Sequence, residues 1–318
     1  MLAFSRFTRY FIEVARCGSI RKASDVLHVS ASAIDRQILK AEEELGAQLF
    51  ERLPGRLRLT AAGELLLVDA RQWEKAYART LERFDELKGL RRGHVDIATI
   101  DALSEGLAMQ AIAGLIREHP GITFGLATAD NQEVGHRIAT AEVDFGLMLD
   151  PAGASLEVRA FAEVPLGIAM PPEHVLATRR ELQLAETLEH GLLLPDAPLI
   201  VSDHAKVLYQ RQHIDTARLS RCNDVRAMRA LIRDGAGVGL LSWLDAAPDV
   251  AAGRLAFVPL RAQLTKPLTL ALCVAPQRQL SRAAQMAIQA LAPVVEGGVG
   301  WEQWSARTRE RQGAVHPT

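Results

Sequence analysis

The sequence predicts an α/β protein in three parts: a helix-rich N-terminal region, a long central helix and a two-lobed α/β domain. Apolar residues recur every three or four positions between residues 1 and 60, which is typical of short amphipathic helices. A heptad pattern follows between residues 66 and 87, and strand-like and helix-like segments alternate from residue 92 to residue 296. Such alternation favours a parallel sheet covered by helices.

The composition excludes several classes of protein. Of 318 residues, 48% are hydrophobic and 24% are charged, so the chain can bury the cores of two or three domains. Arg6, Arg9 and Glu13 interrupt the N-terminal apolar residues, and no run of 18 apolar residues occurs. We therefore expect neither a signal peptide nor a membrane span, and these features favour the cytoplasm.

Residues 1 to 60 have the pattern of a helix-turn-helix. Apolar residues at spacings of three and four predict the inner faces of three helices: Phe4, Phe7, Phe11 and Val14; Ile20, Ala23 and Val26 or Leu27; Ile34, Ile38, Ala41 and Leu45. Ser19 and Ser30 fit N-caps, because a serine hydroxyl accepts hydrogen bonds from the free amides of a first turn. Gly46 is expected to end the third helix. Two short helices joined by a turn, the second with a polar outer face, are typical of a helix-turn-helix.

A two-stranded wing is expected after the third helix. Pro54-Gly55 is a strong turn signal, and Arg56-Leu57-Arg58-Leu59 alternates polar and apolar residues as a half-exposed strand does. On such a wing, Arg52, Arg56 and Arg58 would lie against a phosphate backbone. Residues 1–60 hold ten Lys or Arg and seven Asp or Glu, a net charge of +3, whereas the whole chain carries −1. The positive charge therefore lies where a DNA reader is expected.

An ordered series of short motifs runs through this region. It consists of Gly18-Ser19, Ala23, Leu27, Val29-Ser30, Ala33-Ile34, Arg36-Gln37-Ile38, Glu43-Glu44-Leu45-Gly46, Leu49-Phe50-Glu51-Arg52 and Leu59-Thr60-Ala62-Gly63. The series resembles the N-terminal winged helix-turn-helix of the LysR-type transcriptional regulators. The resemblance implies a sequence-specific regulator of transcription that binds double-stranded DNA and is not an enzyme. It places the DNA-binding surface at Ser30, Ala31, Ser32, Asp35, Arg36, Gln37, Lys40, Arg52, Arg56 and Arg58.

Three residues, Ala31, Ser32 and Asp35, depart from the family pattern. Ala31-Ser32 stands where Gln-Pro is usual, and Asp35 stands where Ser is usual. Ala31 cannot hydrogen-bond a base edge through its side chain, although it can contact a thymine methyl group. Asp35 either accepts from a cytosine amino group or pairs with a nearby arginine, and the pairing is favoured. These departures concern the preferred DNA site and not DNA binding itself.

Residues 61–89 are expected to form one long linker helix. Thr60 fits its N-cap and Gly89 fits the residue after its last turn, with no proline between them. A heptad seam predicts pairing with a partner helix; it comprises Leu66, Ala70, Trp73, Tyr77, Thr80, Phe84 and Leu87. The alternative is packing on the second domain of the same chain. In the resembling family this helix pairs two subunits, which implies a homodimer or homotetramer.

From residue 92 to residue 296, strand and helix patterns alternate in two sets. The first set comprises strands Val95–Thr99, Ile122–Thr128 and Val143–Met148 and helices Glu105–Arg117 and Gln132–Thr140. The second comprises strands Val164–Ala169, Leu199–Val201 and Leu268–Val274, a turn into a strand at Gly235–Leu241, and helices His204–His213, Asp224–Asp234 and Ser281–Leu291. We expect lobe I to hold residues 92–163 and 268–296 and lobe II to hold 164–267. Two crossings then create a hinged cleft.

Three landmarks in this half are His119-Pro120-Gly121, Val143-Asp144-Phe145-Gly146-Leu147 and Ala236-Gly237-Val238-Gly239-Leu240-Leu241. They resemble the effector domain of the same family, which has a periplasmic-binding-protein fold. The resemblance implies a small-molecule effector between the lobes, at Ile100, Asp101, Ser104, Thr128, Asn131, Ser202 and Asn223. Helix N-termini there favour an anion, whereas Asp101 disfavours a dicarboxylate, so the effector class stays open. For each of these residues, a role as helix cap or turn former is the alternative.

No cofactor or metal site is expected. The chain lacks HExxH, GxSxG, P-loop and GxGxxG motifs, and its nine histidines show no metal-ligand spacing. Cys17, Cys222 and Cys273 lie far apart without a CxxC, which excludes a disulfide framework and leaves a thiol switch as the alternative to ordinary buried cysteines. An enzyme, a solute carrier and an architectural DNA protein are the competing classes.

The last segment, residues 297–318, is rich in Gly, Arg and Gln without periodicity, so we expect a mobile tail. Trp301 and Trp304 are candidates for docking on a surface. RNA polymerase is the further partner that the family resemblance implies.

Overall fold

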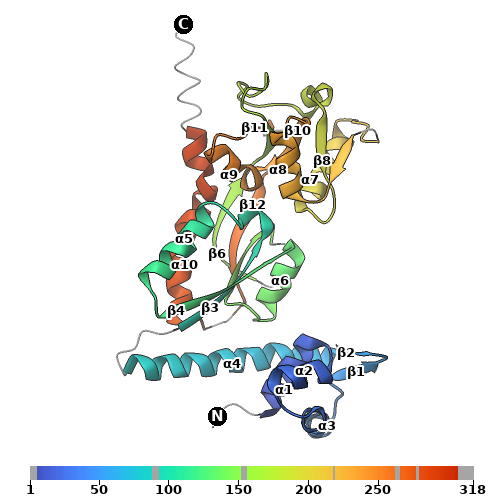
Figure 1. The fold of residues 1–318 in the computed structure, drawn as a ribbon, viewed down its shortest axis with the longest axis vertical. Helices are drawn as coiled ribbons and strands as arrows, with labels where there is room; N and C mark the ends of the chain where they lie inside the picture. Colours follow the sequence, from blue (N-terminus) through green and yellow to red (C-terminus); the bar gives the residue numbers. More distant parts are fainter. Residues whose placement is uncertain are drawn as a thin grey trace.

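The computed structural model describes residues 6–87, 93–151, 156–217, 219–261, 266–276 and 279–306. Figure 1 shows an elongated molecule with the N-terminal helices and wing at one end and two α/β lobes stacked above the long helix α4. The fold is α/β, as the sequence predicts. None of the described helices is long and apolar enough to cross a membrane.

The N-terminal region folds as a winged helix-turn-helix. It comprises α1 (Arg6–Cys17), α2 (Ile20–Leu27), α3 (Ala31–Leu45) and the antiparallel pair β1 (Phe50–Leu53) and β2 (Arg56–Leu59). Phe11, Ile34 and Ile38 are fully buried at its centre, as their spacing predicts. Leu45, expected on the same inner face, is 55% exposed, because α3 ends there and its last turn extends past the core. Phe4 lies outside the described residues.

The helix ends follow local capping rules. The Ser19 hydroxyl accepts from the Lys22 amide, and the Ser30 hydroxyl accepts from the Ala33 amide, so both predicted N-caps are confirmed. Gly46 adopts a φ of 66° at the end of α3, which only glycine does at little cost. Thr60 accepts from the Gly63 amide and begins the next helix.

Helix α4 (Ala61–Leu87) follows the wing as one continuous element. Its first turns pack on the N-terminal core, where Leu67 and Ala70 are buried together with Phe11. The opposite end of the predicted helix, including Gly89, lies outside the described residues. The winged helix-turn-helix of residues 6–59, or reading head, therefore shares one core with the start of α4.

Two five-stranded sheets form the rest of the chain. The first has the order β4-β3-β5-β12-β6 and comprises β3 (Gly93–Ile100), β4 (Ile122–Ala129), β5 (Phe145–Leu149), β6 (Glu157–Val164) and β12 (Leu268–Val274). Strands β3, β4 and β5 are parallel, and β12 runs antiparallel to both its neighbours. Its helices are α5 (Leu107–Glu118), α6 (Asn131–Ala139) and α10 (Arg282–Glu296), with the short turn η1 (Asp101–Leu103).

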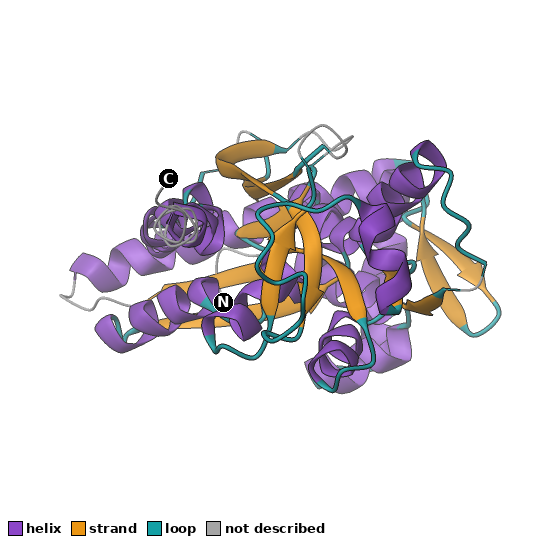
Figure 2. Ribbon diagram, turned by 90° about the horizontal axis from the view of Figure 1, so that it is seen from above, coloured by secondary structure: helices purple, strands orange, loops and turns teal. Residues whose placement is uncertain are grey.

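The second sheet has the order β11-β7-β10-β8-β9. It comprises β7 (Leu166–Met170), β8 (Leu192–Pro195), β9 (Ser220–Cys222), β10 (Val238–Ser242) and β11 (Ala256–Pro259), with η2 (Leu184–His190), α7 (Ile200–Arg211), α8 (Val225–Arg233) and α9 (Trp243–Ala251). The chain passes from the first sheet to the second at Pro165 and returns between β11 and β12. Figure 2 shows strands in the interior with helices on their flanks.

One predicted strand is wrong. Leu199–Val201 begins a helix, with Leu199 as the N-cap residue of α7, and the strand of this region is β8, a short distance upstream. Short apolar runs fit a strand and a buried helical turn equally well, which explains the error. The sequence also gave no signal for β6, β9, β11 or α9, whose patterns are short or mixed.

The expectation of a mobile tail from residue 297 is wrong for residues 298–306. These residues form η3 (Gly298–Gly300) and a short helical turn, and Trp301 and Trp304 pack against buried aromatic rings. Aromatic burial thus orders a segment whose composition suggested otherwise. Residues 307–318 lie outside the described residues.

Candidate nucleic-acid interface and inter-lobe pocket

The outer face of α3 presents the polar residues that the sequence singles out. Ser30, Ser32, Arg36 and Lys40 are exposed, whereas Ala31, Asp35 and Gln37 are half-buried. Ile34 and Ile38 lie on the opposite, buried face, so the helical period separates the core from this surface. The Ser30 and Ser32 hydroxyl oxygens are 3.3 Å apart, and the Lys40 ammonium lies 3.6 Å from the Glu44 carboxylate.

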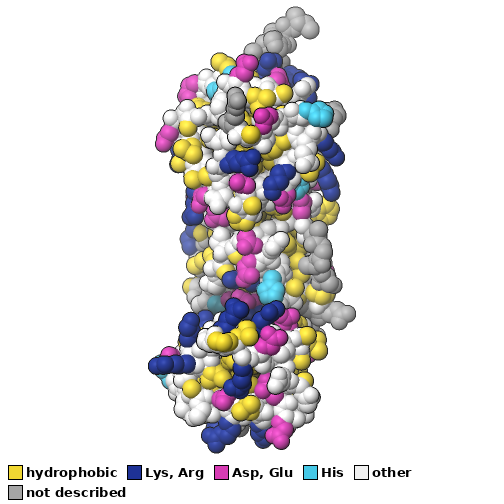
Figure 3. Space-filling view, turned by 90° about the vertical axis from the view of Figure 1, so that its right-hand side faces the viewer, with side chains coloured by type: hydrophobic (Ala, Val, Ile, Leu, Met, Phe, Trp, Pro, Cys, Tyr) yellow, Lys and Arg dark blue, Asp and Glu magenta, His cyan; other side chains and the backbone are white. Residues whose placement is uncertain are grey.

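The wing stands beside this helix and carries three arginines. Arg52 donates to the Asp35 carboxylate over 2.8 Å, which agrees with the pairing favoured for Asp35. Arg56 and Arg58 are exposed, and no carboxylate pairs with them within the described part of the chain. On the face shown in Figure 3, lysine and arginine side chains extend from the lower body of the molecule, where Figure 1 places α1 to α4 and the wing.

Glu42 fixes the wing to α3, a role that no sequence signal indicated. Its Oε1 accepts from the Leu49 amide at 2.7 Å and from the Phe50 amide at 3.2 Å. On the other side, the Leu57 amide donates to the Gly18 carbonyl at 2.8 Å. These bonds hold the wing arginines and the outer face of α3 in one rigid unit.

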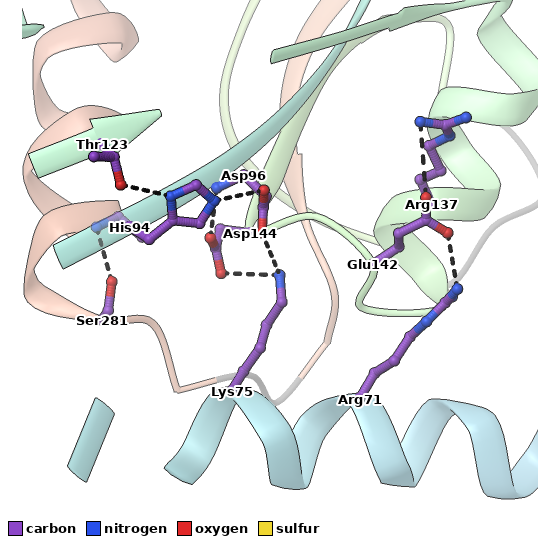
Figure 4. Close-up of polar contacts among 10 residues, drawn as sticks. Arg71, Lys75, His94, Asp96, Thr123, Arg137, Glu142, Asp144 and Ser281 are labelled. Atoms are coloured by element: carbon purple, nitrogen blue, oxygen red, sulfur yellow. Dashed lines mark hydrogen bonds and ion pairs between the residues drawn. The ribbon is translucent and has the colours of Figure 1, made fainter. Parts of the chain in front are cut away.

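Helix α4 contacts the first lobe of its own chain through ion pairs (Figure 4). Arg71 donates to Thr140 at 2.8 Å and to Glu142 at 2.9 Å, and Lys75 lies 3.2 Å from Asp144. The second oxygen of Asp144 accepts from the Asp96 amide of β3. Burial lowers the pKa of Arg71, although the Glu142 carboxylate opposes this shift. One face of α4 therefore packs on its own chain, which was the alternative to subunit pairing.

The heptad seam lies on the opposite face of α4. Trp73 is 52% exposed and Phe84 is 55% exposed, whereas Ala70, nearer the start of the helix, is buried in the N-terminal core. Residues three and four apart share a helix face, so Trp73 and Phe84 form one apolar stripe with Thr80 between them. Large apolar side chains grouped on an exposed helix face are typical of an interaction surface.

A pocket of about 310 Å³ lies between the two lobes. Five of the seven predicted effector residues line it: Ile100, Asp101, Thr128, Asn131 and Asn223. The remaining wall is mainly apolar and comes from both lobes: Ala102, Ala129, Leu149, Pro198, Leu199, Ile200, Val201 and Val225.

Two predicted effector residues, Ser104 and Ser202, do not line the pocket, and a third, Asn131, lines it but is hydrogen-bonded within lobe I. The Ser104 hydroxyl donates to Asp101 at 3.4 Å, and Ser202 is buried in the first turn of α7; neither lines the pocket. The Asn131 amide bonds both to the Leu149 carbonyl and to the Leu149 amide, each at 2.8 Å, so it ties α6 to β5. Thr128 and Asn223 are exposed to the pocket.

The charged residues that line the pocket are all acidic. They are Asp101, Asp130, Asp224 and Asp245, of which the sequence singled out only Asp101. Asp130 and Asp224 accept from the first amides of α6 and α8, so the positive ends of these helices already face a carboxylate of the protein. Burial raises the pKa of Asp245, against the lowering effect of its bonds to Ser242. The pocket is therefore poorly suited to a polycarboxylate.

Within the described residues, no group of three or more His, Cys, Asp and Glu side chains is placed to hold a metal ion. Burial raises the pKa of the Cys273 thiol to about 11, and the Cys17 thiol donates to Glu13 at 3.2 Å. A high thiol pKa opposes thiolate formation, so these cysteines lack the environment of reactive ones.

Two family models match the chain. The model for the LysR substrate binding domain matches residues 88–296, and the model for the bacterial regulatory helix-turn-helix protein of the lysR family matches residues 6–64. Among curated proteins, the RuBisCO operon transcriptional regulator of Allochromatium vinosum is 27% identical over 238 residues. The match covers 74% of this chain and 78% of that protein.

Solved structures agree with this fold. A full-length OxyR variant from Pseudomonas aeruginosa has a TM-score of 0.67 at 20% identity, covering 91% of this chain and 93% of that one. Full-length CbnR in complex with its target DNA has a TM-score of 0.54 at 23% identity, covering 90% of this chain and 97% of that one. The whole architecture, from reading head to second lobe, is thus shared with these structures.

Proposed function

Since this chain belongs to the LysR family of transcription regulators and is a DNA-binding regulator rather than an enzyme, we propose a division of labour among its parts. Residues 1–60 bind the operator, and residues 61–89 pair two subunits. Residues 92–296 bind the effector, with 92–163 and 268–296 as lobe I and 164–267 as lobe II. The separate hydrophobic cluster of the N-terminal region and the two crossings between the sheets, at Pro165 and between β11 and β12, support these boundaries.

The wing and the outer face of α3 form the DNA-binding surface in this proposal. The observation that carries it is the rigid placement of two unpaired arginines, Arg56 and Arg58, beside the polar face that bears Arg36 and Gln37. Arg36 and Gln37 have the hydrogen-bonding groups to read base edges, whereas the wing arginines suit phosphates. Asp35 acts by holding the Arg52 guanidinium of the wing beside α3.

Subunits pair through the exposed seam of α4. Burying Trp73 and Phe84 against the same residues of a second copy removes the largest apolar side chains of this stripe from water. Pairing brings two reading heads onto one duplex, and each head adds avidity to the other. We extend the proposal to assembly of two such dimers, action in the cytoplasm and contact with RNA polymerase.

The inter-lobe pocket binds the effector. Among the described residues, its lining holds no lysine or arginine and its wall is mainly apolar, which favours a molecule with an apolar body over a dicarboxylate. The effector shifts the equilibrium between two lobe arrangements only to the extent that it binds one arrangement more tightly than the other. Lobe I then passes the change to α4 through the contacts of Arg71 and Lys75.

Footprinting on the DNA upstream of the chain's own gene tests the function. Purified protein should protect a two-fold symmetric site, and the affinity should fall steeply with salt because phosphate contacts release counterions. Arg36→Ala should weaken protection without changing the size of the dimer. Equal affinity for this site and for shuffled DNA at low salt, with or without cell metabolites, would contradict the proposed operator-binding surface.

A further inference from the structure

The C-terminal strap, defined as residues 297–306, leaves α10 of lobe I and packs on lobe II. Figure 1 shows it continuing in red beyond α10 alongside α9. The match to the family's substrate-binding domain ends at residue 296, so the strap lies outside the part of the chain that the family model describes. Its function is therefore not given by the family's domain.

An aromatic cluster holds the strap in place. Trp301 and Trp304 of the strap meet Trp243 of α9 and Phe257 of β11, and the ring centroids lie 4.9 to 6.3 Å apart. The two strap rings also stack on each other with centroids 5.3 Å apart. Distances and tilts of this kind are favourable for aromatic pairs.

A buried hydrogen bond and a strained residue fix the backbone of the strap. The Trp243 indole N–H donates to the Val299 carbonyl at 3.2 Å in the interior. Val299 has a φ of 52°, a conformation that a β-branched residue adopts only when its surroundings hold it there. Gly300, with a φ of 85°, turns the chain beside Leu107 of α5. These features indicate that the strap backbone holds one defined position against lobe II.

The strap sits at the point where the lobes join. Gly298 lies beside Val164, the last residue of β6, and the Trp243 amide donates to the carbonyl of Pro165, where the chain crosses into lobe II. The strap is anchored to lobe I by α10, β6 and α5, while its rings contact lobe II. Rotation of the lobes must therefore slide Trp301 and Trp304 over Trp243.

Ion pairs also join the lobes, in addition to the hydrophobic cluster that they share. Glu105 lies 3.1 Å from Arg229, Asp150 lies 3.2 Å from His204, and Asp101 lies 3.8 Å from Arg226. Exposed ion pairs exchange with water at little cost. Undocking the strap would instead expose large apolar rings and leave a buried indole N–H without its acceptor, so the strap adds a substantial resistance to opening.

The first turn of α9 connects the strap to the effector pocket. Trp243 contacts the strap rings, and Asp245 in the same turn lines the pocket and bonds to Ser242. A ligand that displaces Asp245 must move the turn that carries Trp243. The strap and the pocket thus act on one short rigid element.

We propose that the C-terminal strap is an inter-lobe clasp that sets the lobe angle of the effector domain and thereby the range over which the effector can move it. The proposal rests on the proposed function, in which lobe motion carries the signal. It predicts that the strap restrains lobe motion even without DNA or effector, because its contacts are all within one chain.

Spin labels on the full-length chain can measure the lobe separation. Gln132→Cys on α6 and Gln210→Cys on α7 place one exposed label in each lobe. Cys17→Ser and Cys222→Ser remove the accessible thiols, while Cys273 is fully buried and stays. Labelled subunits are diluted with unlabelled ones so that distances within one chain dominate.

The variant Trp301→Ala/Trp304→Ala undocks the strap, and Trp304→Leu is a milder change that keeps an apolar side chain. Three of the four tryptophans lie in the cluster, so near-ultraviolet circular dichroism reports docking directly. Leu231→Ala removes an exposed apolar side chain from α8 of lobe II and is the matched control.

The parent chain should show a narrow distance distribution and a strong near-ultraviolet signal. Undocking should remove most of the signal and broaden the distribution by about twofold or more, Trp304→Leu should do so partially, and Leu231→Ala should leave both the signal and the distances unchanged. Loss of the signal with an unchanged distribution in either strap variant would overturn the clasp. A parent chain without a coupled tryptophan signal would also overturn it. Neither outcome depends on DNA or effector, so failure here leaves the footprinting result standing, and the reverse holds.

Discussion

Arg56 on the wing offers the sharpest test of the DNA-binding surface. Its side chain is exposed next to the tight turn at Gly55, and no carboxylate neutralises it within the described residues. In a dimer, Arg56→Ala removes two phosphate contacts. Each contact contributes about 0.9 to the slope of log affinity against log salt, so the slope should become shallower by about 1.8. Between about 50 and 200 mM salt, the loss of affinity should then shrink by about one decade.

Fluorescence anisotropy of a labelled operator across this salt series measures the slope. Arg56→Lys keeps the charge and should keep the slope, although it loses the bidentate geometry. Arg180→Ala removes an exposed arginine from lobe II and should leave both affinity and slope unchanged. A slope for Arg56→Ala equal to that of the parent chain would refute the phosphate contact. Sedimentation of each variant must show an unchanged dimer for this reasoning to apply.

Three further predictions follow from packing and charge. Gly63→Ala should destabilise the reading head by about 1–3 kcal/mol in urea unfolding, because a Cβ there overlaps the Leu49 carbonyl, whereas Gly114→Ala on α5 meets open space and should be neutral or stabilising. The hydrogen bond that His204 donates to the Asp150 carboxylate raises the pKa of His204 above its ordinary 6.5. The stabilisation that this pair contributes to the folded state is therefore fully present below pH 6.5 and is lost as the pH rises through the raised pKa of His204. His204→Gln should for this reason lower the melting temperature more at pH 5.5 than at pH 8.5. Trp73→Glu should raise the dimer dissociation constant by more than about tenfold in sedimentation velocity, because it buries a charge in the seam.

Local rules explain why the fold of residues 1–60 could be predicted. Ser19, Ser30 and Gly46 act within one helical turn, so their capping roles can be read from neighbouring residues alone. The wing turn at Gly55 has a φ of 75°, which its Pro-Gly pair already signals. Long-range packing decides the rest, and there the sequence misleads. Leu199 lies in an apolar run that fits a strand. In the structure, however, β8 occupies that position in the second sheet, and Leu199 is the N-cap residue of α7.

The same distinction applies to the candidate sites. Arg36 and Arg56 follow from a helix face and a hairpin, both local patterns. The pocket aspartates Asp130 and Asp245 come from different lobes, and only the fold brings them to one cavity. The ordered structure of the strap could not be predicted for the same reason. Trp301 contacts Trp243 of α9 and Phe257 of β11, which are more distant in the sequence than local rules reach.

The joint that transmits an effector signal can be located from the kinds of contact along the chain. The first turns of α4 share a dry core with α1, where Leu67, Ala70 and Phe11 are buried, so the reading head must move together with α4. Lobes I and II share one continuous hydrophobic cluster, against which the aromatic strap packs. Between α4 and lobe I, by contrast, the contacts of Arg71 and Lys75 are ion pairs and hydrogen bonds. These side chains are largely buried, but exchanging them for other polar partners exposes no apolar core. The α4–lobe I contact is therefore the compliant joint of the subunit, and a change in lobe angle is passed on as a change in the direction of α4 and of the reading head fixed to it.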